Sequence, residues 1–153
     1  MARVRRRRRG TAIVETEKGI IVVAERSGIF TLPGGEARKH ETRTQAAMRE
    51  LREETGLQPH SAKCLFHHRG RVHKSHGHGY FRDHHTVCLV KAAGTARPHR
   101  EIEYVEHYEP GSGIHVSGVT KEIIDTYYAY KRRGRLKREL VCVFNRTWEW
   151  LGF

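Results

Sequence analysis

Residues 35–57 read GEARKHETRTQAAMRELREETGL, and this stretch decides the expected fold. Thr42, followed three residues later by Gln45, forms a capping box, so a helix is expected to begin just after Thr42. Gly56 is the type of residue that commonly ends a helix in the left-handed conformation. The stretch therefore predicts one helix, which follows the chain break at Pro33-Gly34-Gly35.

Three carboxylates share one face of the expected helix, because Glu50, Glu53 and Glu54 stand at positions i, i+3 and i+4. Like charges at this spacing repel and raise one another's pKa values, whereas a divalent cation would make the same cluster favourable. Acidic helix faces are usually only solvated. The adjacent Gly34-Gly35 turn favours a metal site, because it allows a close backbone approach and can offer a carbonyl oxygen.

The same stretch resembles the Nudix box, G-x5-E-x7-R-E-U-x-E-E-x-G-U, at every defined position from Gly35 to Leu57. Phe30-Thr31-Leu32-Pro33-Gly34 also resembles the usual lead-in to that box. The resemblance implies an α/β fold, namely the Nudix-type α/β/α sandwich with a mixed β-sheet. It also implies a hydrolase that cuts a diphosphate linkage.

The resemblance further implies a set of metal ligands and a set of catalytic residues. The expected ligands of Mg²⁺ or Mn²⁺ are Gly35, Glu50, Glu53 and Glu54. The expected catalytic residues are Glu50, Glu53 and Arg49, and Arg49 would orient a carboxylate. Bound metal ions would neutralise phosphate charge, after which phosphoryl transfer needs mostly positioning and electrostatics.

Residues around the box receive structural or substrate-binding roles by the same resemblance. Gly34, Glu41 and Gly56 are expected to be structural, with Glu41 helping to hold the loop to the helix. Arg26 follows the second expected strand, where family members frequently hold substrate phosphate. Glu103 lies in the segment from which many members place a further acid near the metals. An exposed surface position is an equally good interpretation of each.

The substrate class implied by the resemblance is a nucleoside diphosphate derivative. Modified nucleoside triphosphates, ADP-ribose-like compounds and dinucleoside polyphosphates all fit, and nothing in the sequence selects among them. An alternative is a nucleic-acid-binding protein with a non-catalytic Nudix fold that uses its basic ends, with an affinity that falls steeply as salt rises.

Positive charge is concentrated in two terminal segments, although the net charge of the 153 residues is +12. Residues 1–9 contain six arginines and residues 131–138 contain six basic residues, whereas residues 10–130 contain 16 basic and 15 acidic residues. Blocks of like charge are usually solvated tails that can also bind polyanions. We therefore expect a disordered basic tail over residues 1–9 and a single domain over residues 10–153.

Residue patterns predict the remaining secondary structure. Strands are expected over residues 11–14, 20–24, 29–32, 64–68, 86–92 and 140–144, with a hairpin turn at residues 17–19 and a helix over 119–130. Between the fourth and fifth of these strands, residues 67–85 contain seven of the 12 histidines and several interleaved basic residues. This segment is interpreted as a loop, either in solvent, at a substrate, or holding structural zinc.

Cysteine and hydropathy patterns limit the class of protein. Cys64, Cys88 and Cys142 are widely spaced and odd in number, which disfavours a disulfide framework and indicates a cytoplasmic location. No apolar stretch approaches the length of a membrane span. Trp148, Trp150 and Phe153 are expected to pack on the domain or on a second subunit, so a homodimer is one of the expected arrangements.

Overall fold

The structure is a computed structural model that describes residues 3–77 and 79–150, with side chains through Arg135. The chain forms two compact units, Met1–Thr120 and Lys121–Phe153. The single domain predicted over residues 10–153 stays a prediction, and each unit is described by itself.

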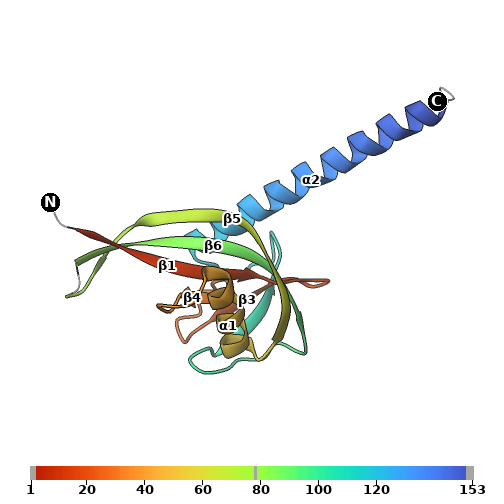
Figure 1. Cartoon of the computed structure of the whole chain (residues 1–153). Coiled ribbons are helices and arrows are strands. Elements are labelled where there is room, and N and C mark those ends of the chain that lie inside the picture. Colours follow the sequence, from red (N-terminus) through yellow and green to blue (C-terminus); the bar gives the residue numbers. More distant parts are fainter. Residues whose placement is uncertain (1–2, 78, 151–153) are drawn as a thin grey trace. The chain divides into compact units, whose positions relative to one another are not determined.

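Two sheets and one helix make up most of the first unit (Figure 1). The seven strands are β1 (Val4–Ile13), β2 (Glu15–Thr16), β3 (Gly19–Ala24), β4 (Gly34–Glu36), β5 (Gln58–Ser75), β6 (Gly79–Ala93) and β7 (Tyr104–Tyr108). One sheet has the order β4-β1-β6-β5, in which only β1 and β6 are parallel, and the other has the antiparallel order β2-β3-β7. The predicted α/β architecture with a mixed sheet is confirmed.

Helix α1 (Arg43–Thr55) has the ends that the sequence predicts. The hydroxyl of Thr42 accepts a hydrogen bond from the Gln45 backbone, and the Gln45 side chain accepts one from the Thr42 backbone, which completes the capping box. Gly56 ends the helix with a φ of 72°, a left-handed conformation that favours glycine. These local signals fix where the acidic face of α1 begins and ends.

The apolar face of α1 packs on the four-stranded sheet. Ala47 and Leu51 of the helix are fully buried in a cluster with Ala12 of β1 and with Cys88 and Val90 of β6. Gly10 of β1 lies directly beneath the helix, since a Cβ there would collide with backbone atoms of Arg43 and Ala47. The burial of this face fixes the position of α1 on the sheet, so its acidic side lies next to β4.

The predicted tail over residues 1–9 is corrected from Val4 onward, because residues 4–9 form the outer half of β1 and pair with Tyr80–His85 of β6. Asp83 supplies the compensating charge. Its carboxylate accepts two hydrogen bonds from Arg7, at 2.6 and 2.9 Å, and the Arg7 guanidinium lies 3.9 Å from the centre of the Phe81 ring.

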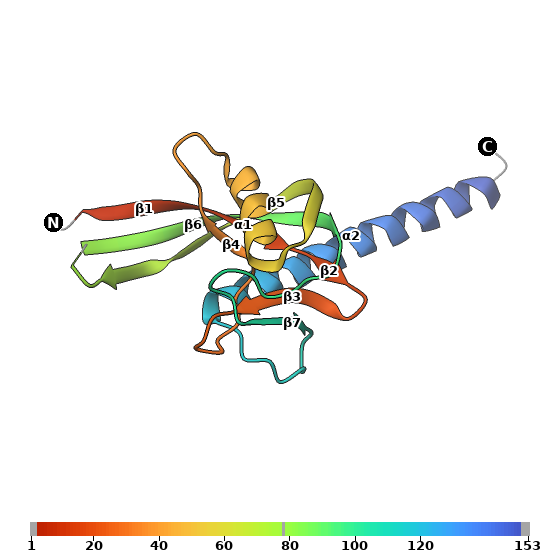
Figure 2. The same cartoon turned by 90° about the horizontal axis from the view of Figure 1, so that it is seen from below.

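The histidine-rich segment is also corrected from a loop to strands. β5 and β6 continue as an antiparallel ladder as far as the pair Ser75 and Gly79, with register shifts on the way. Figures 1 and 2 show β1, β6 and β5 side by side along this extension. The rings of His73 and Phe81 stack across the ladder with centroids 5.5 Å apart. Cross-strand pairing of this kind outweighs the local loop composition.

Helix α2 runs from Gly118 to Trp150 and includes the predicted helix over 119–130. The strand predicted over residues 140–144 is wrong, because the neighbouring Leu, Lys, Arg and Glu residues favour the continuing helix. The packing predicted for Trp148, Trp150 and Phe153 lies outside the described side chains. Within the described chain, no helix is both long and apolar enough to cross a membrane.

Candidate active site

Arg49 of α1 joins the loop before the helix to the acidic face. Its guanidinium donates two hydrogen bonds to the Glu41 carboxylate, at 2.8 and 2.9 Å, one to Glu50 at 2.8 Å and one to Glu53 at 3.1 Å. A fifth goes to the Glu36 carbonyl at 3.3 Å. Arg49 thus ties the loop at Glu41 to α1, and the structural role expected of Glu41 stays a prediction.

The charges in this network stabilise one another. The hydrogen bond from Arg49 lowers the pKa of Glu41 to about 2, well below its ordinary value. The same contact, followed by that with Glu50, raises the pKa of Arg49 further above its ordinary value. Arg49, Glu41, Glu50 and Glu53 have side chains that are each only 14–17% exposed, so solvent screens their interactions weakly.

Neither glycine of β4 leaves room for a Cβ unless a neighbouring group moves. A Cβ on Gly34 would collide with the carbonyl oxygen of Gly10, and a Cβ on Gly35 would collide with the Glu50 carboxylate. Neither glycine has a positive φ. The backbone of β4 therefore lies close to β1 at Gly34 and close to the acidic face of α1 at Gly35.

Glu54 is a buried acid with an abnormal pKa. The residue is 8% exposed, and its carboxylate accepts a hydrogen bond from the Gly34 backbone at 3.2 Å. Burial raises its pKa to about 8, and the charges of Glu50 and Glu101 add to the increase. A carboxyl group that resists ionisation marks a place where positive charge is missing.

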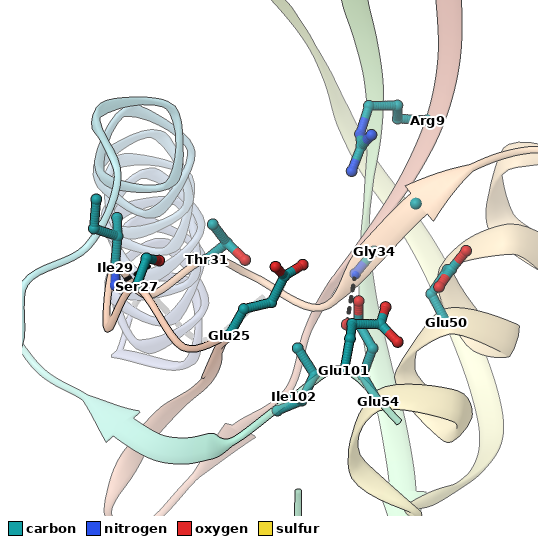
Figure 3. A pocket seen from close by; sticks show the side chains of 11 residues that line it. Arg9, Glu25, Ser27, Ile29, Thr31, Gly34, Glu50, Glu54, Glu101 and Ile102 are labelled. Carbon is teal, nitrogen blue, oxygen red and sulfur yellow. Dashed lines mark hydrogen bonds between the residues drawn. The ribbon is translucent and has the colours of Figure 1, made fainter. Parts of the chain in front are cut away.

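These groups open into a pocket of about 500 Å³, a volume typical of small-ligand sites (Figure 3). Its lining residues come from β1, β4, α1 and the segments after β3 and before β7, and they are Arg9, Glu25, Ser27, Ile29, Thr31, Gly34, Gly35, Glu50, Glu54, Glu101 and Ile102. In Figure 3, Glu54 and Glu101 lie on one side of Gly34 and Arg9 lies on the other.

The sequence did not predict that three of the lining residues belong to the pocket. Arg9 is the one basic residue among the described residues that line the pocket, although the sequence placed it in a tail. Glu25 and Glu101 also line it, whereas the sequence favoured their neighbours Arg26 and Glu103. Arg26 and Glu103 are exposed and outside the lining, and their substrate-binding roles stay predictions.

Glu53 faces arginines and lies outside the pocket lining. Its carboxylate lies 3.1 Å from both Arg49 and Arg100 and 3.7 Å from Arg38. Arg100 adopts a φ of 54°, an uncommon conformation for a residue with a side chain. In the part of the chain that the structure describes, no three His, Cys, Asp or Glu side chains converge on one metal position, and this includes the described histidines of residues 67–85. The predicted ligand set therefore stays a prediction.

A family model for the NUDIX domain matches residues 4–114, which is most of the chain. The chain belongs to the Nudix hydrolase family. Members of this family act on phosphorus-containing anhydrides, so this Nudix hydrolase is placed in that enzyme class. The predicted fold class, the Nudix-type sandwich, is confirmed.

Solved structures resemble this Nudix hydrolase over most of its length. A Chromobacterium violaceum protein described as a Nudix hydrolase family member is 30% identical, with 94% of this chain and 95% of that chain covered and a TM-score of 0.64. The ORF135 protein of E. coli is 20% identical, with 84% and 92% covered and a TM-score of 0.63.

A third similar structure is a bifunctional NMN adenylyltransferase/ADP ribose pyrophosphatase from Francisella tularensis, complexed with AMP and a Mn ion. It is 20% identical, with 84% of this chain and 42% of that chain covered and a TM-score of 0.60. At this identity the likeness concerns the fold alone. Among curated proteins, no sequence matches this Nudix hydrolase.

Proposed function

We propose that this Nudix hydrolase cleaves a diphosphate linkage in a nucleoside diphosphate derivative, with Mg²⁺ or Mn²⁺ as its cofactor. The observation that carries the proposal is the pocket in which Glu50, Glu54 and Glu101 face the backbone of Gly34 and Gly35. In the reaction, a water oxygen forms a bond to one phosphorus and the bond from that phosphorus to the bridging oxygen breaks. The other phosphate leaves with the bridging oxygen, and the protons of the water pass to the phosphate products or to solvent.

The residues of the pocket suit a hard divalent cation. The available donors are carboxylate and carbonyl oxygens, which Mg²⁺ and Mn²⁺ prefer. The pKa of Glu54 is raised first by burial and then by the negative charge of Glu50, and a bound cation would favour its ionised form. We assign Gly35, Glu50, Glu53 and Glu54 to hold the cation, and Glu53 would have to leave its arginine partners. When bound, the cation supplies electrostatic stabilisation of the phosphate oxygens.

The protein's own groups position the substrate and the acids. Arg49 fixes the direction of the Glu50 carboxylate through its 2.8 Å contact, and the Gly34 backbone fixes Glu54. Arg9 brings positive charge into a pocket that is otherwise lined by acids and uncharged residues, so we assign it to a substrate phosphate. Such positioning is most of what phosphoryl transfer requires from a protein.

A nucleotide substrate is supported by the fold and by the pocket. The Francisella protein, a bifunctional adenylyltransferase and ADP ribose pyrophosphatase by its description, was solved with AMP and a Mn ion. The lining also offers apolar surface from Ile29, which is 46% exposed, and from Ile102. These side chains could contact a base or a sugar. Modified nucleoside triphosphates, ADP-ribose-like compounds and dinucleoside polyphosphates are the substrates to compare.

The test incubates the full chain with these three kinds of compound and Mg²⁺ and follows the phosphate-containing products. The doubly substituted Glu53→Gln, Glu54→Gln protein should lose turnover. A matched variant, Glu17→Gln with Glu106→Gln, removes two exposed carboxylates elsewhere and should keep it. Absence of turnover in the unaltered protein with all compounds, or equal losses in both variants, would contradict the proposed function.

Cation binding can be measured without turnover. Thermal unfolding with and without Mg²⁺ or Mn²⁺ should show stabilisation that depends on cation concentration, because a ligand of the native state raises its stability by mass action. The Glu53→Gln, Glu54→Gln protein should lose most of that shift. A shift that is equal in all three proteins would place the cation elsewhere.

A further inference from the structure

Strand alternation divides the run of five arginines in β1 between two faces of the sheet. Side chains of successive residues in a strand point to opposite faces. Arg5, Arg7 and Arg9 therefore share one face, from which Arg9 reaches the active-site pocket. Arg6 and Arg8 lie on the other face, the one on which α1 packs over Gly10. The same run thus contributes to two different environments.

The arginines that share a face with Arg9 are paired with acids. Arg7 makes its two hydrogen bonds to Asp83, and Arg9 lies 4.0 Å from the same carboxylate. Arg5 pairs with Glu36 at 2.7 Å. Each arginine of this face has a carboxylate within ion-pairing distance.

The opposite face collects cations from three strands. The register places Arg6 of β1 beside Arg82 of β6, and Arg8 of β1 beside His84 of β6. On its other side, β6 pairs with residues of β5. Paired residues of neighbouring strands project from the same side of a sheet. We call this surface the basic face, and its members are Arg6, Arg8, Arg69, Lys74, Tyr80, Arg82 and His84.

The basic face has no compensating acid. Among the residues that the structure describes, no ion pair joins its cations to a carboxylate, and Arg8 donates a hydrogen bond to the backbone carbonyl of Glu41 at 3.1 Å. The Nε of Arg82 is buried and has no hydrogen-bond partner there. The pKa of His84 is lowered, first by partial burial and then by the charges of Arg6, Arg69, Arg82 and Arg43. Clustered cations without acids repel one another, so an anionic partner would stabilise the surface.

The basic face also presents an exposed aromatic ring. Tyr80, at 38% exposure, pairs with Val4 on one side and with Lys74 on the other. Rows two residues apart on one face of a strand are spaced by about 6.6 Å, so the cations of Arg6 and Arg8 follow Tyr80 in line along β1 and β6. Phosphate-binding cations in line with an aromatic platform are typical of proteins that bind unpaired nucleotides.

We propose that the basic face binds a single-stranded nucleic acid, with its arginines at the phosphates and Tyr80 stacked on a base. Arginine forks fit phosphate oxygens in two-point contacts. Tyr80 favours a single strand over a duplex, because only unpaired bases expose a ring face to it. The proposal is independent of the proposed hydrolysis, because no member of the basic face lines the active-site pocket.

The test measures binding of a fluorescent oligouridylate of about 12 nucleotides, within the usual site size for such proteins, to the full chain. Fluorescence anisotropy between about 50 and 200 mM salt gives the salt dependence of the affinity. Arg6→Gln with Arg69→Gln should reduce the slope of log K against log salt by about 1.4, because each lost contact to a single strand contributes about 0.7. The matched control, Lys18→Gln with Lys63→Gln, removes two exposed charges elsewhere and should leave the slope unchanged.

Tyr80→Ala separates stacking from charge. It should weaken oligouridylate binding about five-fold to 100-fold while leaving the salt slope unchanged, because stacking on one base is lost and no phosphate contact is lost. A single-stranded DNA of equal length should bind in the same way, and a duplex of equal length should bind more weakly. Equal effects of both double variants, an unchanged affinity of Tyr80→Ala, or preference for the duplex would overturn the proposal.

Two further measurements keep the result interpretable. Far-ultraviolet circular dichroism and thermal unfolding of every variant should match the unaltered protein, because the substituted side chains are exposed. Hydrolysis of the best small nucleotide should be retained in every variant, because none of them lines the pocket. Loss of RNA binding with retained hydrolysis supports the basic face, and failure of the hydrolysis proposal would leave the binding result unaffected.

Discussion

Replacement of Arg49 by lysine keeps the positive charge but removes the planar fork that holds the active-site acids. In the structure, all five N–H donors of Arg49 are used: four on the carboxylates of Glu41, Glu50 and Glu53 and one on the Glu36 carbonyl. A lysine ammonium has three donors and cannot make the two-point contact with Glu41. Arg49→Lys therefore loses at least two of these five hydrogen bonds.

The expected loss of stability is about 2–3 kcal/mol, from two such bonds at about 1–1.5 kcal/mol each. This lies below the about 3–5 kcal/mol for breaking a fully buried ion pair, because these side chains keep 14–17% of their exposure. For a chain of this length, the melting temperature should fall by about 4–12 °C.

The loss should also depend on pH, and the sign follows from Glu41. Its folded pKa, about 2, lies below its ordinary value of 4.5, so its contribution to stability is complete above pH 4.5 and disappears as the pH falls toward 2. Arg49→Lys removes the main cause of that low pKa. The difference in stability between the two proteins should therefore be largest near neutral pH and should shrink in acid.

Thermal and urea unfolding of both proteins across this pH range provide the measurement. Arg52→Lys is the matched control, since Arg52 is an exposed arginine of the same helix. Two results would refute the reasoning. One is a melting temperature of Arg49→Lys within the scatter of Arg52→Lys, and the other is a stability difference that does not change between neutral pH and acid.

Three further predictions concern β1, β4 and β6. Burial and then the charge of Arg9 lower the pKa of His85 from 6.5 to about 4, so the free energy of unfolding should fall by about 3 kcal/mol as the pH drops from 6.5 to 4. Urea unfolding of His85→Gln should lack this fall. An equal fall in the variant would show that His85 is not its cause. Gly35→Ala should displace the Glu50 carboxylate and reduce kcat about 100-fold with little change in melting temperature. The control Gly118→Ala adds a methyl group in open space and should leave the steady-state kinetics unchanged. Equal kinetics in the two proteins would contradict the assignment of the pocket as the active site. Arg9→Gln should raise KM about ten-fold or more if Arg9 holds substrate phosphate, and a KM no higher than that of Arg5→Gln would exclude that role.

Local signals in the sequence were sufficient for the helix and for its acidic face. The capping box at Thr42 and the left-handed Gly56 depend on residues close together in the chain, and both have the predicted geometry. The acids of α1 followed from helical spacing in the same way. Of the three acids on this face, Glu50 and Glu54 line the pocket and Glu53 does not.

The other walls depend on contacts between distant segments, which the sequence does not display. Arg9 reaches the pocket because β1 pairs with β4, and Glu101 reaches it from the segment before β7. The arginine run suggested a tail because its compensating acids, Asp83 and Glu36, lie far along the chain. The sequence choices of Arg26 and Glu103 each lie within two residues of a lining residue, and which neighbour faces the site depends on the tertiary course of the backbone.

The register of β1 decides both surfaces of this Nudix hydrolase at once. A slip by one residue would exchange the two faces of the strand, so that Arg6 and Arg8 would face Asp83 and the paired arginines would move to the face on which α1 packs. Gly10 prevents such a slip, because a side chain at its position would collide with the backbone of α1. The glycine that admits the acidic helix thus also fixes which arginines meet acids and which remain available to an external anion.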